Sequence, residues 1–221
     1  MPAGQKKEVK VMKTILFQGD SITDCGRLTT GGAGYPQVNL GPGYVGLIAS
    51  RILLDYAGKN YSILNRGISG NRVVDLYARW KIDALNLDPD IISILIGVND
   101  SWHEIESANG VELPRYDEFL RRLLSWSREH NPKVNLVLLE PFLIPQTPQQ
   151  ESMMAEVRER AKIVRQAAAD FQAIFIPLQD KLEQAVRSVS KEYFVVDGVH
   201  PNLAGHQLIA DAWLAAVGKL L

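Results

Sequence analysis

The sequence predicts an α/β fold in which a parallel β-sheet is covered by helices on both sides. Short apolar segments of strand length alternate with longer segments whose apolar residues recur with helical periodicity. Residues 91–96 are apolar at nearly every position, as expected for a central parallel strand that is buried on both faces. Because parallel strands need crossover connections, this alternation places the helices on the two faces of the sheet.

Five strands and five helices are expected from the periodicity. The strands are predicted at residues 13–18, 61–65, 91–96, 134–139 and 173–177. The helices are predicted at residues 44–56, 73–87, 114–129, 151–171 and 203–220. Apolar residues at three- and four-residue spacing place Trp80 on the inner face of the second helix and Trp213 on that of the last.

The composition is that of an ordinary globular protein. The chain has 221 residues, of which 46% are hydrophobic and 22% charged, with a formal net charge of -1 and a pI near 6.4. This balance does not favour nucleic acid or an anionic membrane as a partner. No apolar run approaches the roughly 18 residues of a membrane span.

The N-terminal segment carries four lysines between residues 6 and 13. A signal-peptide n-region is one interpretation, but the apolar run that follows is too short for its hydrophobic core. We therefore expect residues 1–12 to be a flexible tail and residues 13–221 to form a single domain. Cys25 is the only cysteine, so that no intrachain disulfide can form, and a cytoplasmic enzyme is expected.

Two irregular segments are candidates for framing a site. Residues 28–43 are rich in Gly, Thr and Pro and are expected to form a mobile loop beside Ser21. Residues 141–150 contain three prolines and no clear period. Loops without a role are common, so that neither segment indicates a function by itself.

Chemically capable residues follow the predicted strands. Ser21 follows the first strand, Gly70 and Asn71 follow the second, and Asn99 follows the third. Asp197 and His200 lie just before the last helix. Because ligands of open α/β sheets bind beyond the carboxyl ends of the strands, these residues are expected to share one site.

Three of them have the chemistry of a catalytic triad. A serine hydroxyl such as that of Ser21 is a weak nucleophile unless a base accepts its proton, and the base needs an orienting acceptor. Imidazole titrates near neutral pH, which suits His200 as the base. Gly198 permits a tight bend that would bring Asp197 against the ring. Taken by themselves, Asp197 and His200 are more typical of a cap at the start of the last helix.

Acyl transfer also requires donors for an oxyanion, each worth about 2.7–4 kcal/mol of barrier. The backbone N–H of Ser21, the backbone N–H of Gly70 and the side-chain amide of Asn99 are the candidates. Gly70 and Asn99 could each be plain turn residues instead. The joint occurrence of all these parts in separate post-strand loops favours a hydrolase.

The same residues resemble the four ordered sequence blocks of the SGNH hydrolases, also called GDSL-type esterases. The resemblance implies a flavodoxin-like, three-layer α/β/α sandwich and a metal-free serine esterase mechanism without a cofactor. It assigns Ser21 as the nucleophile and Asp197 and His200 as its partners. Ile22 stands where the family usually has Leu. The matching blocks are Gly19-Asp20-Ser21, Gly70, Gly97-Val98-Asn99-Asp100 and Asp197-Gly198-Val199-His200-Pro201.

Longer stretches are similar to the intracellular acetyl-xylooligosaccharide esterases of this superfamily. That resemblance implies removal of acetyl groups from short sugar chains and assembly as a homo-oligomer. The expected substrate-binding residues are Asp20, Tyr44, Asn71 and Trp102. Aromatic faces such as those of Tyr44 and Trp102 stack on sugar rings, although most such aromatics are core residues. The similar stretches are residues 19–27, 41–45 and 65–71, together with Arg79-Trp80 and Trp102.

Two other functions are compatible with the same residues. A lysophospholipase or thioesterase would use the same catalytic parts on longer acyl chains. A non-catalytic saccharide-binding protein would bind ligand without a reactive Ser21. No metal site is expected, because the sequence has no cysteine pair and no H-E-x-x-H motif.

Overall fold

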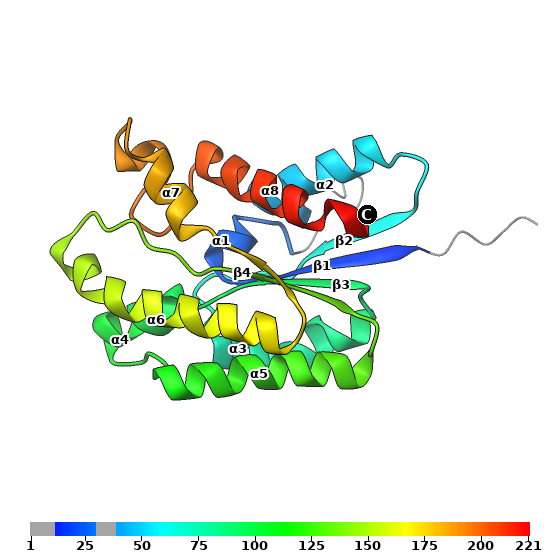
Figure 1. Ribbon diagram of the computed structural model, residues 1–221, viewed down its shortest axis with the longest axis horizontal. Helices are drawn as coiled ribbons and strands as arrows, with labels where there is room; N and C mark the ends of the chain where they lie inside the picture. The colour runs from blue at the N-terminus through cyan, green and yellow to red at the C-terminus, as the bar shows by residue number, and fades with distance from the viewer. Residues whose placement is uncertain (1–11, 30–38) are drawn as a thin grey trace, which may run out of the picture.

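The computed structural model describes residues 12–29 and 39–221. The five predicted strands form one parallel sheet in the order β2-β1-β3-β4-β5, which confirms the predicted fold class (Figure 1). Apart from Met12, the predicted tail lies outside the described residues, as does the middle of the predicted loop at residues 28–43. The strands are β1 (Lys13–Gly19), β2 (Tyr61–Asn65), β3 (Ile91–Leu95), β4 (Asn135–Leu139) and β5 (Ile174–Ile176).

Helices cover both faces of this sheet, giving three layers (Figure 1). On one face lie α2 (Tyr44–Asp55), α7 (Gln179–Ala185) and α8 (Leu203–Val217). On the other lie α3 (Val73–Asp83), α5 (Leu113–His130) and α6 (Pro148–Asp170). Two short helices, α1 (Ser21–Asp24) and α4 (Val98–Ser107), follow β1 and β3 directly.

The sheet separates two hydrophobic cores, because successive side chains of a strand point to opposite faces. In β1, Ile15 and Phe17 belong to the core beneath α2 and α8, whereas Leu16 belongs to the core beneath α3 and α5. Trp213 and Trp80 are fully buried in these two cores, as predicted. Each indole N–H donates to a serine hydroxyl, Trp213 to Ser93 at 3.0 Å and Trp80 to Ser127 at 3.1 Å.

The structure differs from the prediction at short helices. Helices α4 and α7 were not predicted. The buried residues of α4 are Val98, Asn99, Asp100 and Ser101, so this helix buries mainly polar side chains. The predicted helices 73–87 and 203–220 end as α-helices at Asp83 and Val217, and 3-10 turns complete them.

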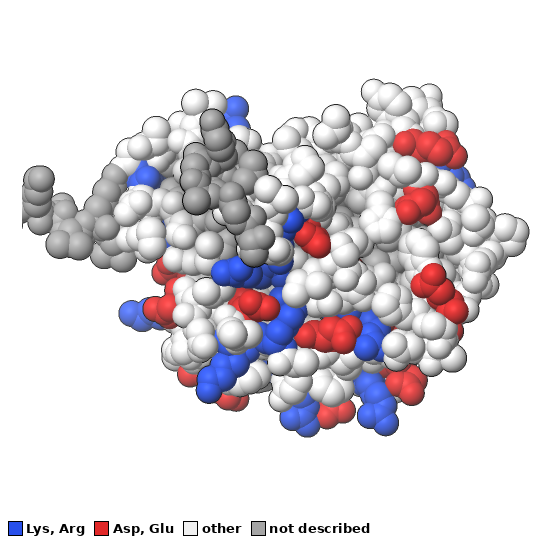
Figure 2. Space-filling view, turned by 180° about the vertical axis from the view of Figure 1, so that it is seen from behind, with Lys and Arg blue, Asp and Glu red and all other residues white. Residues whose placement is uncertain are grey.

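The surface carries charges of both signs close together. On the face shown in Figure 2, basic and acidic side chains are interspersed in one band across the lower half, consistent with the near-zero net charge. Within residues 12–29 and 39–221, no helix has the length and apolar character needed to cross a membrane.

Candidate active site

Ser21, His200 and Asp197 form a continuous hydrogen-bonded chain beyond the carboxyl end of the sheet. Ser21 is the first residue of α1, immediately after β1, and its Oγ lies 2.8 Å from Nε2 of His200. Nδ1 of His200 lies 2.7 Å from Oδ2 of Asp197. With Nδ1–H donating to the carboxylate, Nε2 is left as the acceptor for the serine proton. The structure therefore brings together all three predicted triad residues.

The loop between Asp197 and His200 holds the carboxylate in place. Gly198 has a φ of +89°, a conformation that favours glycine and allows the predicted tight bend. The second carboxylate oxygen, Oδ1, accepts the backbone N–H groups of Val199 at 3.1 Å and of His200 at 2.8 Å. Burial, the largest influence, raises the pKa of Asp197, but the hydrogen bonds from His200 and Val199 together bring it below its usual value. Asp197 is thus an anionic acceptor at neutral pH.

Asp20 caps the short helix that carries the nucleophile. Its Oδ1 accepts the N–H of Ile22 at 2.9 Å, and only 1% of the residue is exposed. Burial raises the pKa of Asp20 to about 7, opposed by the Ile22 hydrogen bond and by the charge of His200. This burial leaves Asp20 little surface for the substrate contact that the sequence predicted. Its cap fixes the turn at Ser21.

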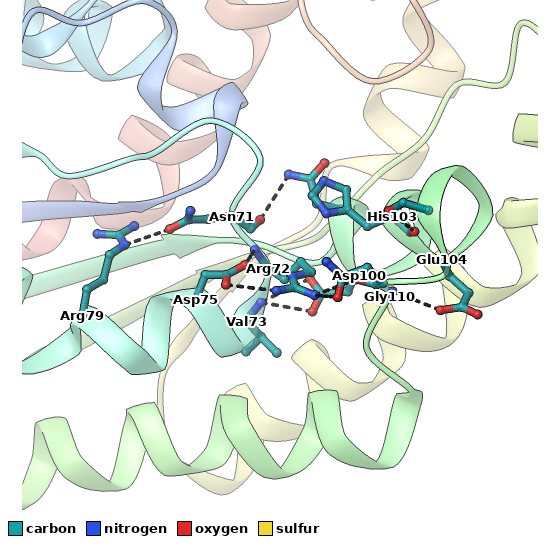
Figure 3. A network of polar contacts seen from close by, with 12 residues as sticks. Asn71, Arg72, Val73, Asp75, Arg79, Asp100, His103, Glu104 and Gly110 are labelled. Carbon is teal, nitrogen blue, oxygen red and sulfur yellow. Dashed lines mark hydrogen bonds and ion pairs between the residues drawn. The ribbon is translucent and has the colours of Figure 1, made fainter.

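The two further candidate oxyanion donors, Gly70 and Asn99, lie in the β2–α3 loop and at the start of α4. Gly70 has a φ of +81°, and a Cβ there would have no heavy atom closer than His103 Cε1 at 4.0 Å. The backbone conformation, rather than lack of space, is therefore what favours glycine at this position. Asn99 lies in the first turn of α4, and its Nδ2 donates to the carbonyl of Asn71 at 3.1 Å (Figure 3).

The remaining substrate-binding predictions have different outcomes. Tyr44 is fully buried, and its hydroxyl is 2.9 Å from Oγ1 of Thr23, which leaves no exposed surface for the predicted substrate contact. Trp102, on α4, is half-buried with its ring centroid 6.3 Å from that of His200, and it stays a candidate. The side-chain oxygen of Asn71 is already occupied by Arg79.

A set of hydrogen bonds that was not predicted holds the backbone of the loop that carries Asp197. Nε2 of Gln150 donates to the carbonyl of Asp197 at 2.6 Å, and Nε2 of Gln146 donates to that of Val195 at 2.6 Å. The backbone N–H of Ile144 donates to the carbonyl of Gly198 at 2.9 Å. These contacts come from the segment 141–150 that was predicted to be irregular, of which residues 148–150 form the first turn of α6. The proline content of this segment was the only signal for them.

Asn99 is expected to contribute strongly to turnover. Replacing Asn99 by alanine removes one oxyanion donor and leaves the Asn71 carbonyl without this partner, so kcat should fall about 100- to 1000-fold with KM nearly unchanged. Steady-state kinetics on p-nitrophenyl acetate measures this. Asn60→Ala, in the exposed turn before β2, is the matched control. A kcat within threefold of the unmodified protein would contradict a role of Asn99 in catalysis.

His206 lies behind the nucleophile turn as a buried neutral imidazole. Its Nδ1 accepts the backbone N–H of Tyr44 at 3.2 Å, and its Nε2 is 3.3 Å from Sγ of Cys25. Because Nδ1 accepts, the neutral ring carries its proton on Nε2. Burial, and secondarily the charge of His200, lowers the pKa of His206 to about 4.

This histidine predicts a loss of stability in acid. The folded state binds the proton more weakly than the unfolded state, so the contribution of neutral His206 is complete above pH 6.5 and is lost as the pH falls towards 4. The loss amounts to about 3 kcal/mol. Urea unfolding of the unmodified protein and of His206→Gln between pH 7.5 and 4 measures it. The two free-energy curves should converge in acid, and parallel curves would contradict the prediction.

Comparison with known proteins places the chain in a family. Residues 17–208 match the model of the GDSL-like lipase/acylhydrolase family, a span that contains Ser21, Gly70, Asn99, Asp197 and His200. The chain belongs to this family. It is a carboxylic-ester hydrolase of the GDSL type.

Relatives in the GDSL family can be aligned with more than nine-tenths of this chain. An acetylxylan esterase of Geobacillus stearothermophilus is 35% identical over 206 residues, which are 92% of this chain and 93% of the relative. A GDSL-like lipase of Parabacteroides merdae is 40% identical with a TM-score of 0.87, covering 93% of this chain and 95% of that one. The solved Axe2 acetylxylan esterase of Geobacillus stearothermophilus is 32% identical with a TM-score of 0.81, covering 93% and 94%.

Proposed function

We propose that this GDSL hydrolase is an acetyl esterase that removes acetyl groups from small, xylooligosaccharide-like saccharides. The observation that carries the proposal is the Ser21–His200–Asp197 hydrogen-bond chain, with Gly70 and Asn99 in adjacent segments. The similarity to acetylxylan esterases over most of the chain supports the acetyl group and the sugar. In Axe2, a serine-to-alanine and a histidine-to-alanine variant are each described as catalytic mutants, which supports the same two residue types here.

The geometry supports a two-step mechanism. Ser21 Oγ attacks the ester carbonyl carbon while Nε2 of His200 accepts its proton. Asp197 holds the ring and stabilises the imidazolium that forms. The oxyanion accepts hydrogen bonds from the N–H groups of Ser21 and Gly70 and from the Asn99 amide. The alcohol then leaves with the proton from His200, and water repeats the sequence on the acetyl-enzyme.

Acyl-chain length is the first test of this function. We expect p-nitrophenyl acetate to be hydrolysed with a kcat/KM at least tenfold above that of the decanoyl ester. NMR of acetylated xylosides, glucosides and amino sugars then identifies the sugar and the position from which acetate is released. Faster turnover of the decanoyl ester would favour the lysophospholipase or thioesterase alternative. Binding of xylosides without any acetate release would favour a saccharide-binding protein.

Three further features belong to the proposal. We propose that residues 13–221 act as a single domain, that the enzyme works in the cytoplasm, and that it assembles as a homo-oligomer. Exposed leucines on α2, Leu53 at 52% and Leu54 at 71%, are compatible with self-association. Sedimentation at several protein concentrations tests the assembly, and fractionation of expressing cells tests the location.

A further inference from the structure

The loop that carries Gly70 has no regular structure and depends on specific contacts for its position. Residues 66–72 connect β2 to α3. On one side, Ile68 N–H donates to the carbonyl of Gly19 at 3.1 Å, and Ser69 N–H and Oγ donate to Oδ2 of Asp24 at 3.1 and 2.9 Å. These contacts fix the first part of the loop against the nucleophile turn. The residue that follows Gly70, Asn71, donates its backbone N–H to the carbonyl of Ile68 at 3.1 Å, and other contacts hold its carbonyl and its side chain.

Asn71 is held at both its backbone and its side chain (Figure 3). Its carbonyl oxygen accepts Nδ2 of Asn99 at 3.1 Å, and its side-chain Oδ1 accepts Nε of Arg79 at 2.8 Å. An amide turned the other way would direct the Asn99 oxygen at the Asn71 carbonyl, placing two acceptors against each other. The Asn71 carbonyl therefore selects the Asn99 orientation in which Nδ2 keeps a second N–H for the anion.

Arg79 connects this loop to the strand that carries the nucleophile. Its side chain is only 13% exposed and reaches from α3 towards the end of β1. Besides Asn71, the guanidinium contacts Oδ2 of Asp83 at 3.2 Å and the carbonyl of Gly19 at 3.4 Å. Gly19 is the last residue of β1, two positions before Ser21. The planar guanidinium of Arg79, which has several N–H donors, therefore connects the loop of Gly70 to the end of β1 before Ser21. These are the two segments that supply the backbone oxyanion donors.

We propose that Asn71 and Arg79 are positioning residues of the oxyanion hole, with Arg79 acting through Asn71. Arg79 fixes the Asn71 side chain, Asn71 fixes the peptide after Gly70, and its carbonyl orients the Asn99 amide. Neither residue contacts the substrate, which replaces the substrate-binding role that the sequence predicted for Asn71. This inference rests on the proposed esterase function. Because the oxyanion exists only in the transition state and intermediate, losing this support lowers kcat and leaves KM nearly unchanged.

A double-mutant cycle tests the proposal. Asn71→Ala and Arg79→Met should each lower kcat on p-nitrophenyl acetate 10- to 100-fold, with KM within threefold. Because Arg79 acts through Asn71, the double variant should be no more than threefold slower than the slower single variant. Arg79→Lys should recover part of the loss. Arg51→Met is the control for loss of an i,i+4 ion pair, since Arg51 pairs in the same way with Asp55 on the exposed side of α2.

Several outcomes would overturn the inference. Losses that multiply in the double variant would show that the two residues act independently. A raised KM with kcat retained in Asn71→Ala would mean that Asn71 binds substrate after all. If Arg79→Met does not fold, Arg79→Lys with Asn71→Ala closes the same cycle. Assaying Ser21→Ala in parallel distinguishes failure of the positioning role from failure of the proposed esterase function. If Ser21→Ala is inactive and Asn71→Ala is unaffected, only the positioning role is overturned. If Ser21→Ala is active, the esterase function is overturned as well.

Discussion

Replacing Ser21 by alanine should lower the turnover of p-nitrophenyl acetate by at least about 10⁴-fold. The substitution removes the hydroxyl oxygen that lies 2.8 Å from His200 Nε2, so the proton transfer to His200 cannot occur and no acetyl-enzyme can form. The backbone N–H groups stay in place, and the fold should be unaffected because Ser21 is only half-buried at the start of α1. Initial rates with purified protein measure the loss.

Covalent labelling gives an independent readout for the same residue. A phosphonate ester that forms a bond to an activated serine should label the unmodified protein at Ser21 and leave Ser21→Ala unlabelled, as peptide mass spectrometry would show. Both proteins should unfold at the same temperature. Near-normal turnover by a folded Ser21→Ala variant would rule out the serine mechanism.

Replacing Trp213 by alanine should lower the free energy of unfolding by about 3–5 kcal/mol. Trp213 is fully buried, its ring centroid lies 5.3 Å from that of Phe17, and its indole N–H donates to Ser93. The substitution would leave a cavity between α8 and the centre of the sheet. It would also leave the Ser93 hydroxyl without this partner in a buried strand.

Urea unfolding at constant pH measures this effect, and Trp126→Ala provides the matched comparison. Trp126, on α5, is only half-buried and packs against Tyr77 at the surface edge of the other core. The same loss of side-chain volume there should cost less, because water can fill the space that is vacated. Equal losses in the two variants would contradict the burial argument.

Much of the fold could be predicted because each strand carries its own evidence. The predicted strand at residues 61–65 matches β2 at both ends, and the apolar run at 91–96 is the buried β3. Trp80 and Trp213 could be placed in the core from periodicity alone. Helix α4 was not predicted, because most of its buried side chains are polar and their partners come from other segments. The carboxylate of Asp100 accepts the N–H of Val73, and the hydroxyl of Ser101 accepts the Nε–H of Arg160.

The candidate site was likewise predictable only in part. The residues that carry chemistry could be proposed from their types and their positions after strands, since the parallel sheet brings strand ends together. The supporting contacts could not, because they join residues far apart in the chain: Gln150 to Asp197, and Arg79 to Gly19. The pKa of Asp20 likewise depends on complete burial, which no local pattern indicates.

Local patterns were enough to predict the alternation of strands and helices, the two core tryptophans and the set of reactive side chains. These follow from periodicity and from the chemistry of single residues. The burial of Tyr44 and Asp20 and the bond between Asn71 and Arg79 became known from the three-dimensional structure alone. Burial and long-range hydrogen bonds depend on which surfaces meet when the layers pack, and that information is distributed over the whole chain.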